Sequence, residues 1–199
     1  MKLIVITTPY FFEGESRMLS ALFREGMEKL HLRKPRSDKE ELRALLEALP
    51  SEYHSRIVVH DHFSLASEYQ LAGIHLNSRN HTIPEGFKGS VSRSCHSLQE
   101  VEDNRQLDYV FLSPIFPSIS KEGYGSNFST EVLRNAASQG IINEKVVALG
   151  GLCEQTIPMI RDLGFGGMAI LGALWGETPE TLQINTIINQ YKKIQLCYC

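Results

Sequence analysis

The sequence places imidazole, guanidinium and carboxylate groups directly after short apolar runs. His31 and Arg33 alternate at the end of one such run, and alternate side chains of a β-strand lie on one face. A second run ends in His60, Asp61 and His62. An arginine at a strand end suits bidentate binding of phosphate or carboxylate, and Asp61 is a hard oxygen ligand for Mg²⁺. The pattern predicts a site for an anionic small molecule together with magnesium.

Two other interpretations of these groups stay open at this point. Arg33 and Asp61 would form a purely structural ion pair if they faced each other, because arginine is rarely buried without a partner. Alternatively, histidines on neighbouring strands would converge on a zinc ion, although no other motif in the chain imposes zinc geometry. The candidate zinc ligands are His31, His60, His62 and His75.

Glycines late in the chain indicate phosphate binding. Gly150 and Gly151 follow one strand-like run and precede a helical pattern, and Gly172 follows the next run. Backbone N–H groups at such junctions bind phosphate. Residues 113–125 form the longest stretch without periodicity, and their prolines, hydroxyls and Lys121 suit a loop that closes over an anion. A solvated loop without function is the plain alternative.

Eight β-rich runs would hold these groups, and helical spacing separates most of them. The runs are residues 2–7, 29–33, 56–60, 73–76, 89–94, 108–112, 145–149 and 167–171. The helical patterns are residues 16–29, 37–49, 63–70, 97–104, 129–138, 153–163 and 179–193. Ser37, with Glu40 three residues later, is the expected N-cap of the second helix. Strands that alternate with helices form a parallel sheet, so eight units predict a single (β/α)8 TIM barrel of minimal length over residues 1–199.

In a TIM barrel the working face lies at the carboxyl ends of the strands, which is where the polar groups collect. An open doubly wound sheet is the alternative fold, but no Gly-x-Gly-x-x-Gly follows the first run. The last residues, 194–199, are expected to form a short, disordered tail that includes Cys197 and Cys199.

Composition points to a small-molecule partner and a cytoplasmic location. The 199 residues carry 20 Lys and Arg against 23 Asp and Glu, and the net charge of -3 provides no basic field for nucleic acid or an anionic membrane. The apolar run after Met1 is too short to span a bilayer. Four cysteines without C-x-x-C spacing fit reduced thiols. The sequence leaves a homo-oligomer open.

Five segments, in order and at barrel spacing, resemble the thiamine phosphate synthase family and its relative, the thiazole tautomerase. They are His31-Leu32-Arg33, Gly73-Ile74-His75-Leu76, Ser94-Cys95-His96-Ser97, the stretch 108–121 with Ser113-Pro114-Ile115-Phe116-Pro117, and Ala148-Leu149-Gly150-Gly151. The resemblance covers nearly the whole chain. It implies a TIM barrel that joins hydroxymethylpyrimidine diphosphate to thiazole phosphate and releases magnesium-bound pyrophosphate.

The same resemblance assigns roles to residues of this chain. Arg33, Ser94 and Lys121 would be catalytic, because positive and hydrogen-bonding groups must neutralise the leaving diphosphate. Asp61 and Asn80 would hold Mg²⁺. The substrate-binding residues that it implies are His31, Arg33, His60, Ser94, Ser118, Ser120 and Lys121, with the backbone of Gly150, Gly151, Leu171 and Gly172.

The chain departs from the family's pattern at several of these positions. His31 and Pro35 stand where the family usually has Gln and Lys, and His60 stands where it has Asn. Asn80 stands where a second carboxylate is expected, which removes one negative charge from the magnesium site. Pro114 stands where the tautomerase has its histidine. Two alternatives therefore stay beside the synthase. One is a thiazole phosphate isomerase with His31, His60 or His62 as its base, and the other is a non-catalytic protein that binds thiamine phosphate.

Overall fold

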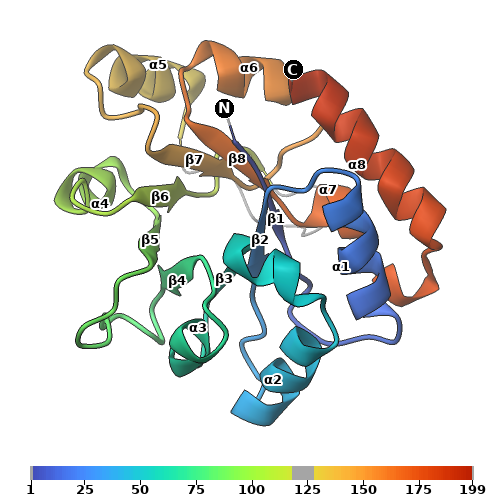
Figure 1. Ribbon diagram of the computed structural model, residues 1–199. Coiled ribbons are helices and arrows are strands. Elements are labelled where there is room, and N and C mark those ends of the chain that lie inside the picture. Colours follow the sequence, from blue (N-terminus) through green and yellow to red (C-terminus); the bar gives the residue numbers. More distant parts are fainter. Residues whose placement is uncertain (1, 118–127, 199) are drawn as a thin grey trace.

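Eight parallel strands close into a barrel in the computed structural model, which describes residues 2–117 and 128–198 (Figure 1). Strand β1 pairs with β2 on one side and with β8 on the other, so the described sheet has no free edge. The strands are β1 (Lys2–Ile6), β2 (Lys29–Leu32), β3 (Ile57–Val59), β4 (Gly73–Leu76), β5 (Ser90–Cys95), β6 (Tyr109–Leu112), β7 (Val146–Leu149) and β8 (Gly167–Ile170). The predicted TIM barrel is confirmed.

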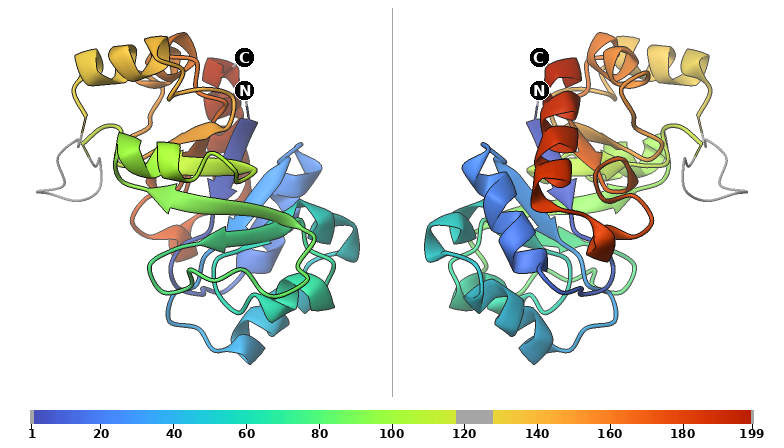
Figure 2. Two further views of the ribbon diagram at one scale, coloured as in Figure 1. Left: turned by 90° about the vertical axis from the view of Figure 1, so that its left-hand side faces the viewer. Right: turned by 90° about the vertical axis from the view of Figure 1, so that its right-hand side faces the viewer.

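Helices cover the outside of the barrel (Figures 1 and 2). They are α1 (Glu15–Arg24), α2 (Lys39–Glu47), α3 (Ser64–Glu68), α4 (Leu98–Asp103), α5 (Thr130–Ser138), α6 (Ile157–Asp162), α7 (Gly172–Trp175) and α8 (Ile184–Tyr198), with 3₁₀ turns η1 (Ser51–Arg56) and η2 (Pro179–Thr181). The sequence patterns do not predict α7 or η1, which are too short to show a helical period, and the predicted helix over residues 179–193 includes η2 ahead of α8. Among the described helices, none has the length and apolar character that crossing a membrane requires.

The start of α2 shows how local chemistry sets a helix boundary. The Asp38 carboxylate accepts a hydrogen bond from the backbone N–H of Glu41, and the Glu41 carboxylate accepts one from the N–H of Asp38. This capping box lies one residue after Ser37 and Glu40, so the predicted N-cap is wrong by one position. The Ser37 hydroxyl instead donates to the Lys34 carbonyl. A carboxylate at the N-cap also interacts favourably with the helix dipole.

The interior of the barrel has an apolar half and a polar half. The apolar half comprises Ile4, Ile6, Tyr109, Phe111, Val147 and Ala169, from β1, β6, β7 and β8. Strands β2, β4 and β5 contribute the buried polar side chains of His31, His75 and Ser92. A larger apolar core lies between the outer face of the sheet and the helices. Because buried polar groups are costly without partners, the polar half must be held by hydrogen bonds.

The C-terminal residues form a helix rather than the expected tail. Helix α8 continues to Tyr198 and packs against α1, α6 and α7. Ile187, Tyr191 and Ile194 are each 1% exposed on its inner face. Their spacing of four and three residues continues the helical period past residue 193, which is why the expectation of a disordered tail is wrong for residues 194–198.

We expect Ile194→Ala to lower the free energy of unfolding by about 2–4 kcal/mol, because truncating a buried isoleucine loses apolar contact and leaves a cavity. Leu196→Ala is the matched control and should change it by less than about 0.5 kcal/mol, since that side chain is 79% exposed. Urea unfolding followed by circular dichroism measures both. Equal effects of the two substitutions would contradict the packing of α8 described here.

Candidate active site at the carboxyl ends of the strands

The carboxyl ends of the strands gather most of the residues that the sequence predicts as functional. Arg33 follows β2, Asp61 follows β3, Asn80 lies in the turn after β4, and Ser94 lies near the end of β5. Gly150 and Gly151 follow β7, and Leu171 and Gly172 follow β8. Ser118, Ser120 and Lys121 lie outside the described residues, so their roles stay predictions.

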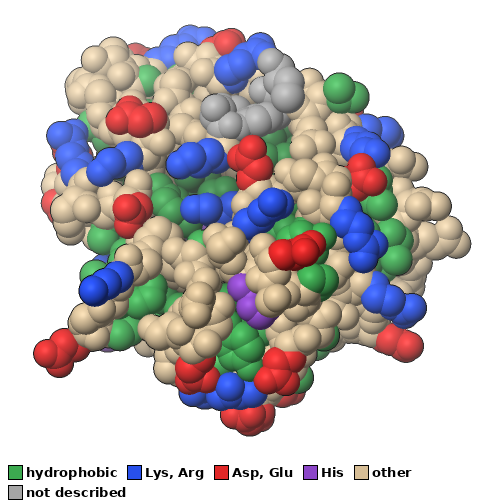
Figure 3. All heavy atoms as spheres, viewed as in Figure 1, with side chains coloured by type: hydrophobic (Ala, Val, Ile, Leu, Met, Phe, Trp, Pro, Cys, Tyr) green, Lys and Arg blue, Asp and Glu red, His purple; other side chains and the backbone are tan. Residues whose placement is uncertain are grey.

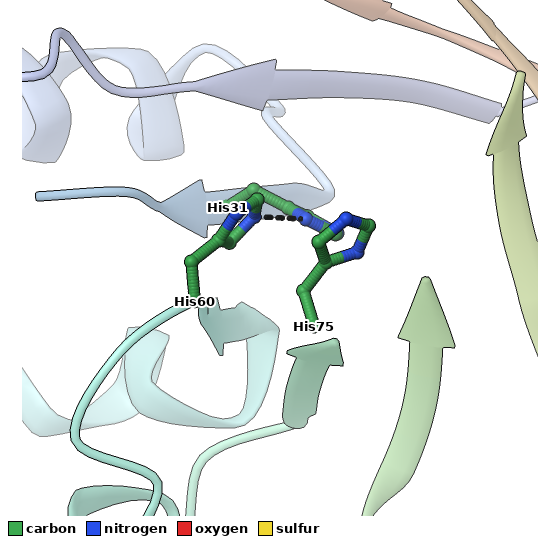
Figure 4. Close-up of side chains that lie close together, drawn as sticks. All are labelled: His31, His60 and His75. Carbon is green, nitrogen blue, oxygen red and sulfur yellow. Dashed lines mark hydrogen bonds between the residues drawn. The ribbon is translucent and has the colours of Figure 1, made fainter. Parts of the chain in front are cut away.

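Three imidazoles are in contact at the floor of this site (Figure 4). His31 from β2, His60 after β3 and His75 from β4 are all buried, with at most 4% exposed. His31 shares a hydrogen bond of 2.9 Å with His60, through Nδ1 and Nε2, and its own Nε2 shares one of 2.7 Å with the Tyr109 hydroxyl. The rings of His60 and His75 stack with centroids 4.2 Å apart. The cluster therefore joins three neighbouring strands and β6 through side chains.

Burial keeps these imidazoles neutral. Desolvation lowers the pKa of His75 to about 3 and holds the pKa values of His31 and His60 well below the usual value. The positive charge of Arg33 lowers the pKa of His60 and of His75 further. A neutral ring has one donor and one acceptor nitrogen, which allows the hydrogen bonds of the cluster to be made. An imidazole whose pKa lies well below the usual value is poorly matched to abstracting a proton near neutral pH, so neither His31 nor His60 is favoured as the base of an isomerase.

The zinc interpretation fits the cluster poorly. The ligand nitrogens of His31, His60 and His75 lie within 4.8 Å of one another. However, His60 and His75 are stacked with an interplanar angle of only 24°, which directs their in-plane lone pairs away from a common point. His62 lies apart from the cluster, because its Nε2–H donates to the Ser37 carbonyl. The structure thus brings three of the four candidate zinc ligands together as a hydrogen-bonded cluster.

Ser94 is held by the same cluster. Both ring nitrogens of His75 are engaged by hydroxyls of the adjacent strand, with Ser92 Oγ at 2.8 Å from Nδ1 and Ser94 Oγ at 2.9 Å from Nε2. Ser92 is fully buried, whereas Ser94 is half-buried toward the strand end. His75 therefore orients the hydroxyl that the family resemblance assigns to catalysis.

Arg33 lies half-buried and without a carboxylate partner among the described residues. Its backbone is fixed by Thr7, whose hydroxyl accepts from the Arg33 N–H and donates to the Arg33 carbonyl. Burial lowers the pKa of Arg33, and the charge of Arg79 lowers it further, while Asp61 opposes both. The alternative of a structural Arg33–Asp61 ion pair is wrong because Asp61 pairs with a different arginine. Arg33 is left available for an anion.

Arg79 and Asn80 donate hydrogen bonds to the carboxylate of Asp61. The Asp61 Oδ1 atom accepts hydrogen bonds from Asn80 Nδ2 at 2.8 Å and from Arg79 Nη2 at 3.1 Å. Arg79 Nη2 also donates to Oδ2 at 3.4 Å. Asn80 Nδ2 donates in addition to the His60 carbonyl at 3.1 Å, so two acceptors fix the orientation of this amide. Sequence reasoning missed Arg79, whose only signal is a basic residue beside Asn80 at a strand end.

This arrangement does not fit the predicted magnesium site. Magnesium requires hard oxygen ligands in octahedral geometry, usually including one or two carboxylates. Of the two predicted ligands, Asn80 presents its NH₂ group to Asp61 rather than its oxygen, and the Asp61 carboxylate is ion-paired with a guanidinium. A divalent cation at Asp61 would have to compete with the Arg79 guanidinium for this carboxylate.

Lys34 is a basic residue near the site that has a structural function. It follows Arg33 but points away from the barrel interior, as expected for the next residue of a strand. Its ammonium group donates to both carboxylate oxygens of Glu15 at 2.6 and 2.8 Å, and the two side chains are 1% and 2% exposed. The pair ties the β2 end to the first turn of α1, so Lys34 does not contribute to anion binding.

The glycine turn after β7 supports the loop that precedes residue 118. Gly150 and Gly151 have φ angles of 98° and 64°, which favour glycine. The Ile115 N–H donates to the Leu149 carbonyl and the Phe116 N–H to the Gly150 carbonyl. A Cβ added at Gly151 would lie 2.6 Å from Phe116 Cβ. The glycines are thus required for close packing of this loop, while their predicted role in phosphate binding stays a prediction.

The opposite end of the barrel has a different character. Figure 3 looks onto that end, where basic and acidic side chains are interspersed with apolar ones. A cavity of about 240 Å³ opens there between the α4–β6 and α5–β7 connections, and Leu107, Val110 and Lys145 are among its lining residues. The histidine cluster and the ends of the active-site strands do not line it, so this cavity is not the candidate site.

The family model described as thiamine monophosphate synthase matches residues 3–174. This chain belongs to that family. It is 28% identical over 160 residues to the thiamine-phosphate synthase of Listeria welshimeri, with 76% of each chain covered. It is 25% identical over 183 residues to the thiamine-phosphate synthase of Archaeoglobus fulgidus, covering 88% of this chain and 86% of the relative. The crystal structure of a thiamine phosphate pyrophosphorylase from Bacteroides thetaiotaomicron is 44% identical, with a TM-score of 0.90 over 99% of this chain and 97% of that one.

Gly151→Ala should destabilise the protein more than Gly164→Ala. Both glycines have positive φ, so alanine costs about 1–2 kcal/mol of backbone strain at either position. Only at Gly151 does the new Cβ also meet the neighbouring loop, whereas nothing lies within 4 Å at Gly164. The excess loss for Gly151→Ala should reach at least about 1 kcal/mol in urea unfolding. Similar losses for the two variants would contradict the packing of residues 114–117 on the glycine turn.

The neutral histidine cluster gives stability a defined pH dependence. Because the folded pKa values lie below the unfolded value near 6.5, unfolding takes up protons in acid. The stabilisation is fully present above about pH 6.5 and falls with decreasing pH, by up to about 1.4 kcal/mol per pH unit for each buried histidine. His75→Gln should therefore reduce the slope of unfolding free energy against pH by up to about 1.4 kcal/mol per pH unit between about pH 6 and pH 5. Urea midpoints at several pH values measure it, and an unchanged slope would show that His75 is protonated in the folded state.

Proposed function

We propose that this protein forms thiamine phosphate by joining hydroxymethylpyrimidine diphosphate to thiazole phosphate, with release of pyrophosphate. Family membership supports the reaction class, and the named relatives are thiamine-phosphate synthases. The observation that carries the proposal for this chain is the half-buried guanidinium of Arg33, which has no carboxylate partner among the described residues and lies at the mouth of the barrel. Such a group is suited to binding a diphosphate.

In the proposed reaction, the bond between the pyrimidine methylene carbon and the diphosphate oxygen breaks, and its electron pair leaves with the diphosphate. The lone pair of the thiazole ring nitrogen then forms the new C–N bond. Negative charge therefore develops on the leaving group, and positive charge on the methylene carbon. Arg33 stabilises the first of these, because a preorganised cation in a partly dehydrated site lowers the energy of the transition state.

The other residues have positioning roles in this proposal. The Ser94 hydroxyl, held by His75, donates to the diphosphate or to the pyrimidine. Lys121 adds a second cation, and Ser118 and Ser120 bind the thiazole phosphate together with the backbone of Gly150, Gly151, Leu171 and Gly172, as the family resemblance implies. His31 and His60 form the neutral floor on which the pyrimidine rests. These steps use only groups of the chain, because Asp61 is already satisfied by Arg79 and Asn80.

We further propose, from the net charge of -3, that the protein acts on free small molecules in the cytoplasm and binds neither nucleic acid nor membranes. No observation on the described histidines favours the thiazole isomerase. Incubating the purified protein with both phosphorylated substrates, with and without Mg²⁺, tests the proposed reaction. Absence of thiamine phosphate under both conditions would overturn it, and calorimetric binding of thiamine phosphate in that case would identify a non-catalytic binding protein.

Arg33→Gln should lower kcat/KM for thiamine phosphate formation by about 100-fold or more, because loss of one transition-state donor costs that much in comparable sites. Arg24→Gln, an exposed arginine at the end of α1, is the matched control and should leave the rate unchanged. Chromatographic assay of the product measures both. Equal rates for Arg33→Gln and the wild type would contradict the role given to Arg33.

A further inference from the structure

We propose that Arg79 supplies, from within the chain, the positive charge that a divalent cation would otherwise bring to Asp61, so that the site binds a diphosphate group without metal. This inference rests on the proposed function for the identity of the anion. It concerns a residue to which neither the sequence analysis nor the family resemblance gives a role.

The turn after β4 holds Arg79 in place. Asn77 and Asn80 exchange two backbone hydrogen bonds, of 2.8 and 3.1 Å, which close the turn. The Asn77 Oδ1 atom accepts from the Arg79 N–H at 3.0 Å, and its Nδ2 donates to the His60 carbonyl at 2.8 Å. Asn80 Nδ2 donates to the same carbonyl, so two hydrogen bonds to His60 hold the turn against the end of β3. The backbone of Arg79 is therefore fixed before any ligand arrives.

The guanidinium of Arg79 has donors left for an anion. It contacts Asp61 through Nε and Nη2, and its Nη1 has no hydrogen-bond partner among the described residues. The side chain is 42% exposed, whereas that of Asp61 is 11% exposed. The Asp61 carboxylate thus binds the Nε and Nη2 atoms of the guanidinium, while the Arg79 side chain stays partly exposed to solvent. A planar guanidinium with five N–H donors can bind a carboxylate and a phosphate in this way at the same time.

Charge balance favours the same conclusion. A site with two carboxylates and Mg²⁺ has no net charge from these three groups, and Asp61 with Arg79 and the neutral Asn80 has none either. The substitution of a carboxylate by Asn80 and the presence of Arg79 therefore compensate each other. Arg33 adds one further positive charge, and its lowered pKa reflects the proximity of Arg79 as well as burial. Two guanidinium groups and one carboxylate that influence one another electrostatically form a net positive site for a multiply charged anion.

Calorimetry with inorganic pyrophosphate tests this inference directly. The wild type should bind pyrophosphate in EDTA, and excess Mg²⁺, which itself complexes pyrophosphate in solution, should not strengthen that binding. Arg79→Gln should weaken binding in EDTA by about tenfold or more, because a charge-assisted contact is lost, and Arg79→Lys should recover part of it. Arg134→Gln, an exposed arginine on α5, is the matched control and should bind like the wild type.

A double substitution removes the Arg79 charge and restores the carboxylate that Asn80 replaces. Arg79→Gln combined with Asn80→Asp frees Asp61 and restores a second carboxylate, so its pyrophosphate binding should become dependent on Mg²⁺. The inference is overturned if the wild type binds pyrophosphate only with Mg²⁺, or if Arg79→Gln binds it in EDTA as tightly as the wild type.

The product assay separates this result from the proposed function. Metal-free pyrophosphate binding that requires Arg79, without formation of thiamine phosphate, would count against the proposed reaction alone. Product formed only with Mg²⁺, together with pyrophosphate binding that requires Mg²⁺, would count against the role of Arg79 alone.

Discussion

The hydrogen bond between His31 and His60 is the contact on which the mouth of the barrel depends. It fixes His60, which leaves the barrel interior just after β3 and whose carbonyl then accepts hydrogen bonds from Asn77 and Asn80. His60 thus contacts the packed interior with its side chain and holds the turn that carries Arg79 with its backbone carbonyl. A buried imidazole without a hydrogen-bond partner would be costly in this interior. The conformation of the histidine cluster and that of the turn after β4 therefore depend on each other.

The neutrality of the floor matters for the charges above it. If the three imidazoles were protonated, they would repel one another and the guanidinium groups of Arg33 and Arg79. Burial prevents this by lowering their pKa values, and the arginines reinforce the effect on His60. A neutral and partly dehydrated floor also screens less than water does, which strengthens the attraction between the two arginines and a bound anion. The polar half of the barrel therefore serves anion binding although it carries no charge itself.

The sequence predicts the barrel and the strands well because β-branched, apolar runs alternate with helical periods along the chain. It also predicts which residues end the strands, since parallel strands place such residues together at one end of the barrel. It does not predict that Asp61 pairs with Arg79 rather than Arg33, because the choice depends on how the turn after β4 folds back. Nor does it predict the buried pair of Lys34 and Glu15, which joins the end of β2 to the start of α1 across 19 positions of sequence.

The turn after β4 also differs from the other connections at the mouth in how it can supply positive charge. The described residues between β4 and β5 contain no helix, whereas helices follow β7 and β8 at the other side of the mouth. A helix that begins after a strand directs free N–H groups at the mouth and provides a partial positive charge there. Asn77 and Asn80 instead use their amides to dock the turn on the His60 carbonyl, which leaves no such charge. Among the ends of β2, β3 and β4, only the end of β4 has neither a following helix nor Arg33 to supply positive charge. The guanidinium of Arg79 supplies it there.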